Sequence, residues 1–282
     1  MTALPDYTVL IPVWIKDNPV FVRQSIDSIL RQTYRADEIL ILCDGPLTND
    51  LNEMLSKFET ENKEVKVIHF TENRGLGPTL ADGVLASSNA IVARMDSDDI
   101  SKPERLEKEI SVLEYGGYDI VGSAIEEFQL QPGDMSSVRI LPTEHSKIAQ
   151  FSKTRNPFNH MSVVFRKESV IRAGNYRSFY LLEDYDLWVR MLLSGSVMHN
   201  LADALVYVRT GNGMISRRGG ISYLKSQIKL LNAFYDYGFI SRLDQITGVL
   251  ARCLITLAPS KLRGLIYSVF LRKPNSGDSC EN

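Results

Sequence analysis

Short runs of β-branched and aliphatic residues alternate with helical patterns through the first hundred residues, and this alternation constrains the fold more than any other feature. Strands that alternate with helices form largely parallel sheets covered by helices. Asn18 is placed to cap the first helix, with Pro19 in its first turn. The sequence therefore predicts an α/β fold, a Rossmann-like and mostly parallel sheet flanked by helices. The expected strands cover residues 7–12, 38–43, 65–70 and 90–95.

Turn residues and carboxylates follow the ends of these strands. In open α/β sheets, ligands bind outside the carboxyl ends of the strands. We therefore expect one crevice to collect the residues that follow the strands, which are Pro12, Asp44, Asn73 and the acidic run 96–99.

The composition is that of a soluble protein with a full hydrophobic core. Hydrophobic residues make up 44% of the 282 residues, and 32 Lys and Arg nearly balance 34 Asp and Glu. Cys43, Cys253 and Cys280 are odd in number and widely spaced, which fits neither a disulfide framework nor a zinc site. No leader-like start and no apolar run of roughly 18 residues is present. A reducing cytoplasm is expected, without secretion or a transmembrane anchor.

Asp96-Ser97-Asp98-Asp99 places three carboxylates within four residues, directly after the fourth strand. Their mutual repulsion would be relieved by a hard divalent cation such as Mg²⁺ or Mn²⁺, which can also bridge to phosphate oxygens. The alternative is a solvated turn before a helix, for which Ser101 and Glu104 have the spacing of a capping box. An EF-hand is disfavoured because its glycine and distal glutamate are missing.

A second acidic segment, 183–188, reads Glu-Asp-Tyr-Asp-Leu-Trp and opens a helical pattern. A carboxylate in a partly dry cleft can act as a general base toward an attacking hydroxyl group. The alternative is that these negative charges only complement the helix dipole.

These segments, in their order along the chain, resemble family 2 glycosyltransferases of the GT-A fold over roughly residues 5–210. The resemblance rests on the strand 9–12, the turn 43–45, the run Asn-Arg-Gly-Leu at 73–76 and the two acidic segments. The stretches 156–160 and 262–267 are similar in particular to bacterial enzymes of O-antigen and exopolysaccharide assembly, of the amylovoran type. Such enzymes add a sugar to an acceptor linked to undecaprenyl diphosphate.

The resemblance implies a nucleotide and metal site at the first group of residues. Asp44 would accept a hydrogen bond from the base, beside Pro12, and the nucleotide pocket would be completed by Asn73 and Arg74. Asp98 would bind Mn²⁺ or Mg²⁺ together with Asp96, which would contact the ribose or a metal-bound water.

It also implies an inverting reaction at the second acidic segment. Asp184, with Glu183 beside it, would take the proton of the acceptor hydroxyl as that oxygen attacks opposite the leaving UDP. A single displacement turns an α-linked UDP-hexose into a β-linked product. We expect galactose or glucose to be joined β1,3 to a GlcNAc-diphosphate-undecaprenol type of acceptor.

Further side chains have two interpretations each. His160 either approaches the acceptor or diphosphate, or is a structural hydrogen-bonding residue. Trp188 either lines the acceptor pocket or lies in the core. A glycine-bounded loop with Arg209, Arg217 and Arg218 either closes over diphosphate or is an ordinary solvent loop.

The C-terminal part is basic, with ten Lys or Arg against two Asp or Glu over residues 217–273. An apolar face recurs at helical spacing from Leu243 to Leu257 and resumes after Pro259, with Arg252, Arg263 and Arg272 off that face. Such helices can lie in the interface of an anionic leaflet, and the alternative is packing against the catalytic domain.

The sequence thus predicts a catalytic domain over 1–216, with a nucleotide half over 1–100 and an acceptor half over 101–216. The basic helical tail, 217–282, would hold the protein peripherally on the cytoplasmic face of the inner membrane, and no nucleic-acid partner is expected.

Two other functions remain open. A sugar-1-phosphate nucleotidyltransferase would have a glycine-rich, Arg-containing loop after the first strand, which residues 12–16 do not provide. A catalytically silent, membrane-associated GT-A scaffold would have lost a metal-binding Asp or the base, and neither is lost.

Overall fold

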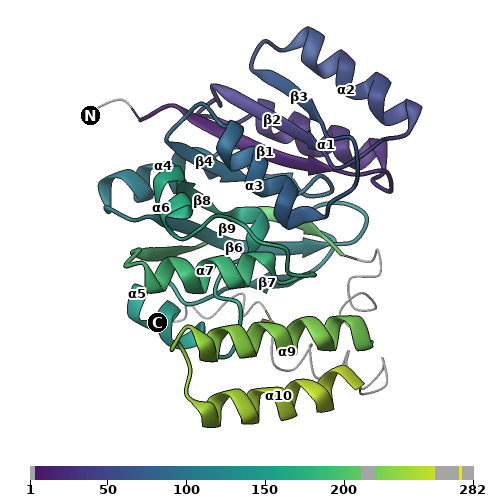
Figure 1. Ribbon diagram of the computed structural model, residues 1–282. Coiled ribbons are helices and arrows are strands. Elements are labelled where there is room, and N and C mark those ends of the chain that lie inside the picture. The colour runs from purple at the N-terminus through teal and green to yellow at the C-terminus, as the bar shows by residue number, and fades with distance from the viewer. Residues whose placement is uncertain (1–3, 211–219, 258–272, 275–282) are drawn as a thin grey trace.

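One twisted sheet runs through the molecule and carries helices on both faces (Figure 1). The computed structural model describes residues 4–210, 220–257 and 273–274. The main path of the sheet has the strand order β10-β7-β6-β8-β4-β1-β2-β3, and β9 joins it beside β6.

The N-terminal half is a parallel sheet, as the alternating pattern predicted. Neighbouring strands pair in parallel from β3 through β2 and β1 to β4. Each expected strand is present to within one residue at either end. The elements of this half are β1 (Tyr7–Val13), α1 (Pro19–Leu30), β2 (Glu38–Cys43), α2 (Asn49–Glu61), β3 (Val65–His69), α3 (Leu76–Ala86) and β4 (Ile91–Arg94).

The capped start of α1 also forms as predicted. The Asn18 side chain accepts a hydrogen bond from the Val20 N–H, and Pro19 stands at the first helical position. Val22, Ile26 and Ile29 are buried against the sheet. This apolar stripe fixes α1 across the parallel strands.

Antiparallel pairings enter in the second half, where β8 pairs with both β4 and β6 and thereby joins the two halves of the sheet. β6 and β9 pair in parallel, and β5 pairs with β9. The elements are β5 (Ile100–Ser101), α4 (Arg105–Tyr115), β6 (Ile120–Phe128), β7 (Ser137–Arg139), α5 (His145–Phe151), the 3₁₀ turn η1 (His160–Ser162), β8 (Val164–Arg166), α6 (Lys167–Arg172), α7 (Glu183–Leu193) and β9 (Met198–Arg209).

The capping box expected at Ser101 and Glu104 was wrong. Ser101 lies in β5, and α4 begins after Glu104 without a hydrogen bond from a capping side chain. The Leu106 N–H in the first turn instead donates to Oε1 of Gln32, which lies just after α1, at 3.0 Å. A tertiary contact therefore replaces the local cap.

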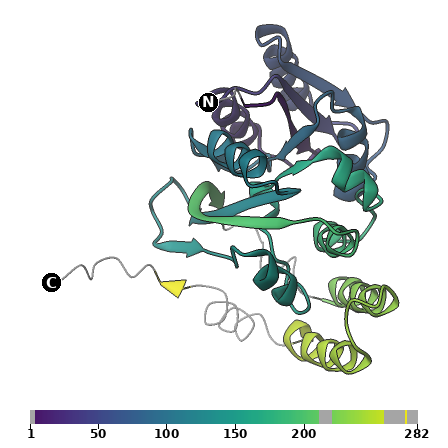
Figure 2. The same ribbon diagram turned by 90° about the vertical axis from the view of Figure 1, so that its left-hand side faces the viewer.

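The last two helices, α9 (Ile221–Asp236) and α10 (Arg242–Leu257), form an antiparallel pair beside α7 (Figures 1 and 2). Phe179, Leu182, Tyr185 and Val189 from the α7 region share a hydrophobic cluster with α9. No described helix is long and apolar enough to cross a bilayer. The short strand β10 (Lys273–Pro274) pairs with β7.

At the amino-terminal end of β2, a polar network surrounds the buried Glu38. Burial alone would raise the pKa of its carboxyl group, but the Lys66 ammonium, the Ser88 N–H and the hydroxyl groups of Thr8 and Ser88 all donate to it and lower the pKa to about 2. The folded protein thus holds this carboxylate charged well below its ordinary range.

Replacing Glu38 by Gln should lower the free energy of unfolding by roughly 2 kcal/mol at pH 7, because the lowered pKa stabilises the folded state above the unfolded pKa. That contribution disappears as the pH falls toward the folded pKa. Denaturant titrations of the wild type and the variant at pH 7 and near pH 3 should therefore show that the difference between their free energies of unfolding becomes smaller at the lower pH. An equal difference at both pH values would mean that the charge is not its source.

Candidate active site

The turn after β2 and the turn before α3 are bound to each other. Asp44 Oδ1 accepts from the Arg74 N–H at 2.8 Å, and Oδ2 accepts from the Gly75 N–H at 3.0 Å. The Asn73 side-chain amide donates to the Asp44 carbonyl at 3.2 Å. Gly45 has a φ of +86°, and a Cβ there would lie 2.6 Å from Asn73 N. The structure thus brings Asp44 and Asn73 together, two of the residues that the sequence placed in one crevice.

The other two expected nucleotide residues flank this pair of turns. Pro12, the penultimate residue of β1, pairs with Leu42 of β2 and is partly exposed. The Arg74 guanidinium is held outward by Asp82 at 2.6 Å and lies 4.5 Å from the Phe70 ring centroid. Their roles toward a nucleotide stay predictions.

The acidic turn forms a cluster that fits a divalent cation. Carboxylate oxygens of Asp96, Asp98 and Asp99 lie within 4.8 Å of one another. Burial, followed by the charges of Asp96 and Asp17, raises the pKa of Asp98 to about 6, and burial with its acidic neighbours raises that of Asp99 well above its ordinary value. Hard oxygen ligands crowded in this way match the donor set of Mg²⁺ or Mn²⁺.

Two side chains that the sequence analysis missed support this turn. The buried Arg94 guanidinium is 2.6 Å from Asp96 Oδ1, and Ser97 Oγ donates to Asp17 Oδ2 at 2.9 Å. A charged residue closing an otherwise apolar strand was a usable signal for Arg94. Asp17 gave none, because it stands in a polar turn before a helix.

Arg209 joins the acidic turn from the end of β9. Its backbone N–H donates to Asp99 Oδ1 at 2.8 Å, and its Nε donates to the Asp98 carbonyl at 3.1 Å. The guanidinium lies between the rings of Phe21 and Phe128, at 3.8 and 4.5 Å from their centroids. The structure therefore places Arg209 at the site, whereas Arg217 and Arg218 lie outside the described residues.

The expected base, Asp184, stands in the first turn of α7. Its Oδ2 accepts from the Asn156 side-chain amide at 2.6 Å, and its Oδ1 accepts from the Tyr185 N–H at 2.7 Å. Burial and the charge of Asp184 raise the pKa of Glu183 to about 8, so Glu183 is largely protonated at neutral pH.

Asp186 is a structural residue and is unsuited to act as the base. Its side chain is 0% exposed, and it forms an ion pair with Arg190 at 2.8 Å. The Tyr237 hydroxyl also donates to it, at 3.1 Å, from the turn after α9.

Arg94 connects the acidic turn with α7. Its positive charge opposes the rise of the pKa of both Asp98 and Glu183, and it contributes to lowering the pKa of His160, although burial is the larger cause there. Gly77, in the first turn of α3, also meets α7: a Cβ at this position would lie 3.3 Å from Glu183 Cβ. The nucleotide-side turns and the expected base thus border one region.

Of the two interpretations given for Trp188, an acceptor-pocket or a core side chain, the structure shows the second. The side chain is 0% exposed and packs among aromatic residues, 5.7 Å from Phe158 and 6.2 Å from Tyr176 between ring centroids. It lies on the inward face of α7, so the alternative of a core tryptophan is correct.

His160 packs beside Trp188 and exchanges a hydrogen bond with the Tyr176 hydroxyl at 3.0 Å. With its lowered pKa it is neutral at pH 7. These contacts fit the interpretation of His160 as a structural hydrogen-bonding residue. A contact of His160 with the acceptor or the diphosphate stays a prediction.

Comparison with known proteins decides the family. Residues 8–177, more than half of the chain, match the profile described as Glycosyl transferase family 2. The chain belongs to glycosyltransferase family 2. It is 36% identical, over 95% of its length and 98% of the relative, to an Escherichia coli protein named UDP-Gal:alpha-D-GlcNAc-diphosphoundecaprenol beta-1,3-galactosyltransferase. It is also 36% identical, over 93% and 97%, to the amylovoran biosynthesis glycosyltransferase AmsE of Erwinia amylovora.

Solved structures share the fold of this glycosyltransferase. Staphylococcus aureus TarS 1–349 in complex with UDP-GlcNAc aligns with a TM-score of 0.67 at 14% identity, over 94% of this chain and 76% of that one. The mannosyltransferase PcManGT from Pyrobaculum calidifontis, in complex with GDP-Man and Mn²⁺, gives 0.62 at 14% identity, over 95% and 82%. The predicted GT-A fold and glycosyltransferase class are thus confirmed.

Asp186→Asn should destabilise the protein by about 3 kcal/mol, because it leaves the Arg190 guanidinium buried without its charge partner. Asp184→Asn on the same helix is the matched control. Its amide oxygen can still accept from the Tyr185 N–H, but its NH₂ group then faces the Asn156 amide, so its cost should be about 1 kcal/mol and stay below that of Asp186→Asn. Denaturant unfolding of both variants measures this. Equal losses would mean that Asp186 has no special structural role.

Proposed function

We propose that this glycosyltransferase transfers galactose or glucose from a UDP-sugar to a GlcNAc-diphosphate-undecaprenol type of acceptor, forming a β1,3 linkage in O-antigen or exopolysaccharide biosynthesis. The observation that carries the proposal is 36% identity over nearly the full length of both chains to the E. coli galactosyltransferase. A relation that extends through the tail favours a shared acceptor class as well as a shared fold.

The nucleotide would bind where the β2 and α3 turns meet. Pro12, Asp44, Asn73 and Arg74 are assigned to the nucleoside, and TarS, which has the same fold, holds UDP-GlcNAc in its structure. Both Asp44 oxygens bind backbone N–H groups here, and each keeps a second lone pair for a base N–H. Binding the turn and binding the base are therefore compatible.

The acidic turn would hold the cation and the diphosphate. Asp98 and Asp96 are the proposed ligands of Mn²⁺ or Mg²⁺, whose chemistry when bound is to neutralise the leaving diphosphate. Arg209, at the end of β9, contacts the same turn, and we assign it, with Arg217 and Arg218, to the diphosphate region.

Asp184 would be the general base. The Asn156 amide donates to its carboxylate and orients it, and burial together with the charge of Asp184 raises the pKa of the neighbouring Glu183. A base on α7 that takes the acceptor proton while UDP leaves on the opposite side supports direct displacement with inversion.

The tail would attach the protein to the cytoplasmic face of the inner membrane, with 1–216 as the catalytic domain and 217–282 as the tail. Four apolar side chains of α10 form one exposed stripe with spacings of three, four and four residues. They are Leu243, Ile246, Leu250 and Leu254, at 71%, 47%, 59% and 77% exposure. Such a stripe can enter the interface of an anionic leaflet.

Arg252 requires a different interpretation from the one made on sequence. It is partly buried and donates to the Thr154 carbonyl at 3.3 Å, so it faces the catalytic body and not the lipid. Arg263 and Arg272 lie outside the described residues. The membrane proposal therefore rests on the apolar stripe and the basic composition of the tail.

Transfer assays with a panel of UDP-sugars and a synthetic GlcNAc-diphosphate-lipid test the function. We expect UDP-galactose or UDP-glucose to yield a β1,3 disaccharide-lipid, and transfer to stop in excess EDTA and return with added Mn²⁺ or Mg²⁺. Product from a sugar nucleotide other than these two would overturn the donor assignment, and full turnover in EDTA would overturn the cation.

Two variants separate the roles within that assay. Asp98→Ala should lose metal-dependent turnover, and Asp184→Asn should bind UDP normally but lose turnover about 10²- to 10⁴-fold. Turnover of the folded Asp184→Asn within threefold of wild type would move the base elsewhere.

The double substitution Leu250→Gln and Leu254→Gln should weaken binding to phosphatidylglycerol vesicles by about tenfold or more, because it removes apolar burial from the stripe. Flotation at low and high salt measures binding. Leu85→Gln with Leu130→Gln is the matched control, since these leucines are 60% and 85% exposed elsewhere on the surface. Equal loss in both pairs, or a wild type that ignores the vesicles, would contradict membrane attachment.

A further inference from the structure

Helix α1 has a buried polar stripe in addition to its apolar one, and this stripe continues two residues past the end of the helix, to Gln32. Ser25, Ser28 and Gln32, three and four residues apart, are only 0%, 9% and 3% exposed. Buried polar side chains lower stability unless they find partners. The partners of these three residues are therefore informative about why the stripe exists.

The two serines bind both ends of the acidic turn. Ser25 Oγ donates to the Asp96 carbonyl at 2.6 Å, and Ser28 Oγ accepts from the Ser101 N–H at 3.0 Å. Main-chain groups on either side of Asp98 are thus attached to one straight helix.

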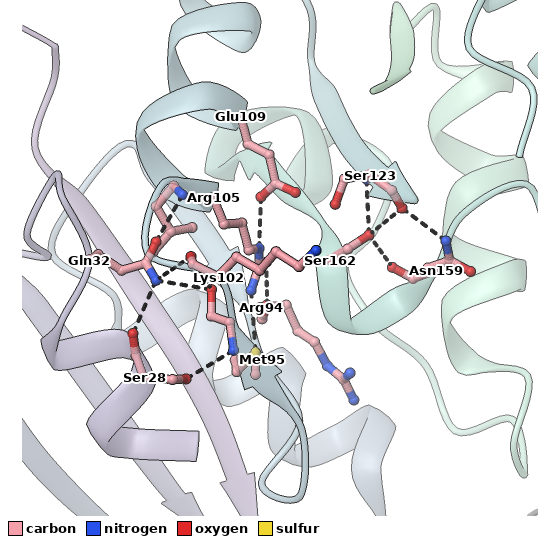
Figure 3. Close-up of polar contacts among 12 residues, drawn as sticks. Ser28, Gln32, Arg94, Met95, Lys102, Arg105, Glu109, Ser123, Asn159 and Ser162 are labelled. Atoms are coloured by element: carbon pink, nitrogen blue, oxygen red, sulfur yellow. Dashed lines mark hydrogen bonds and ion pairs between the residues drawn. The ribbon is translucent and has the colours of Figure 1, made fainter. Parts of the chain in front are cut away.

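Gln32 extends the same attachment toward α4. Its Nε2 donates to the Lys102 carbonyl at 2.9 Å and to Ser101 Oγ at 3.1 Å, while its Oε1 accepts from the Leu106 N–H at 3.0 Å. One buried amide therefore joins the end of the acidic segment to the first turn of the next helix (Figure 3).

Arg105 of α4 binds the segment where it leaves β4. Its Nη2 donates to the Arg94 carbonyl at 2.8 Å, and its Nη1 lies 3.3 Å from Met95 Sδ. Glu109, four residues on, pairs with Arg105 Nε at 2.9 Å, and both side chains are 0% exposed. In Figure 3 the Arg94 side chain points away from this pair, so the pair contacts the Arg94 backbone and leaves its guanidinium for Asp96.

A buried ion pair is weak support for stability, because apolar residues of similar volume often stabilise equally well or better. A requirement beyond packing would account for its presence here. Three carboxylates within 4.8 Å repel one another, and that repulsion would drive the turn open when no cation is bound. Main-chain attachments on α1 and α4 oppose such opening without occupying the carboxylates.

We propose that Gln32 and the Arg105–Glu109 pair are positioning residues, which we call the clamp. They hold the backbone of the acidic turn so that Asp96 and Asp98 are already in position when a divalent cation binds. The inference rests on the proposed cation site. If the acidic turn is held in place before a cation binds, binding does not have to order the turn. Cation affinity is therefore the property that the clamp determines.

The test compares cation affinity with stability. Arg105→Met combined with Glu109→Leu removes the pair while conserving much of its volume, and Gln32→Met removes the amide. Mn²⁺ affinity is measured by the electron paramagnetic resonance signal of free Mn²⁺, and UDP affinity without metal by calorimetry. We expect Mn²⁺ to bind about tenfold more weakly in both variants, with metal-free UDP affinity unchanged.

Thr8→Val is the matched control, because it removes a buried hydrogen bond to Glu38 at the opposite end of the strands. It should lower stability without changing Mn²⁺ affinity. Ser25→Ala, which removes only the contact with the Asp96 carbonyl, carries the test if the larger variants do not fold, and should weaken Mn²⁺ binding a fewfold.

The outcomes separate the two proposals. Folded variants with wild-type Mn²⁺ affinity would overturn the clamp and leave the proposed function intact. A wild-type protein that does not bind Mn²⁺ at all would overturn the cation site and the clamp together. Weakened binding in Thr8→Val equal to that in the clamp variants would reduce the effect to general stability, and would also overturn the clamp.

Discussion

Repulsion among the three carboxylates of the acidic turn is the constraint around which this structure is organised. Burial strengthens that repulsion, and the two together raise the pKa of both Asp98 and Asp99. The protein opposes it with the Arg94 guanidinium, the Arg209 N–H and main-chain contacts from α1 and α4. What these contacts leave uncompensated is negative charge, which matches the charge of a divalent cation.

The parallel sheet is what makes such a turn possible. β1, β2 and β4 are buried and run in the same direction, so their carboxyl ends lie along one edge and the segments that follow them must meet. The antiparallel strand β8 then attaches the second half of the sheet directly to β4. The helix with Asp184 is thereby fixed relative to the strand that precedes the acidic turn.

The sequence predicted features that depend on local pattern, and missed those that depend on tertiary partners. Runs of β-branched residues located the four parallel strands, and the rule for strand ends placed Asp44 beside Asn73. In contrast, Ser25, Ser28 and Gln32 have the pattern of an ordinary solvated helix face, and only the fold shows that the acidic segment covers them. For the same reason, the spacing of Ser101 and Glu104 resembled a capping box, although Gln32 satisfies that helix start. Trp188 and Asp186 lie next to the expected base in sequence, but the helical rotation turns both into the core.

The two helices of the tail, α9 and α10, differ in how they dispose their apolar side chains. Packing on the catalytic body and exposure to a membrane were alternatives for the whole region, but α9 buries Leu230, Leu231 and Phe234 against the α7 region while α10 exposes an apolar stripe. In this helical hairpin the inner helix, α9, packs against the catalytic body, and the outer helix, α10, exposes its apolar stripe to solvent. Arg252 on the outer helix reaches Thr154, two residues from the Asn156 that orients Asp184. If α10 binds a lipid surface as proposed, the Arg252–Thr154 contact links that helix directly to the segment that carries Asn156, and so to the proposed base.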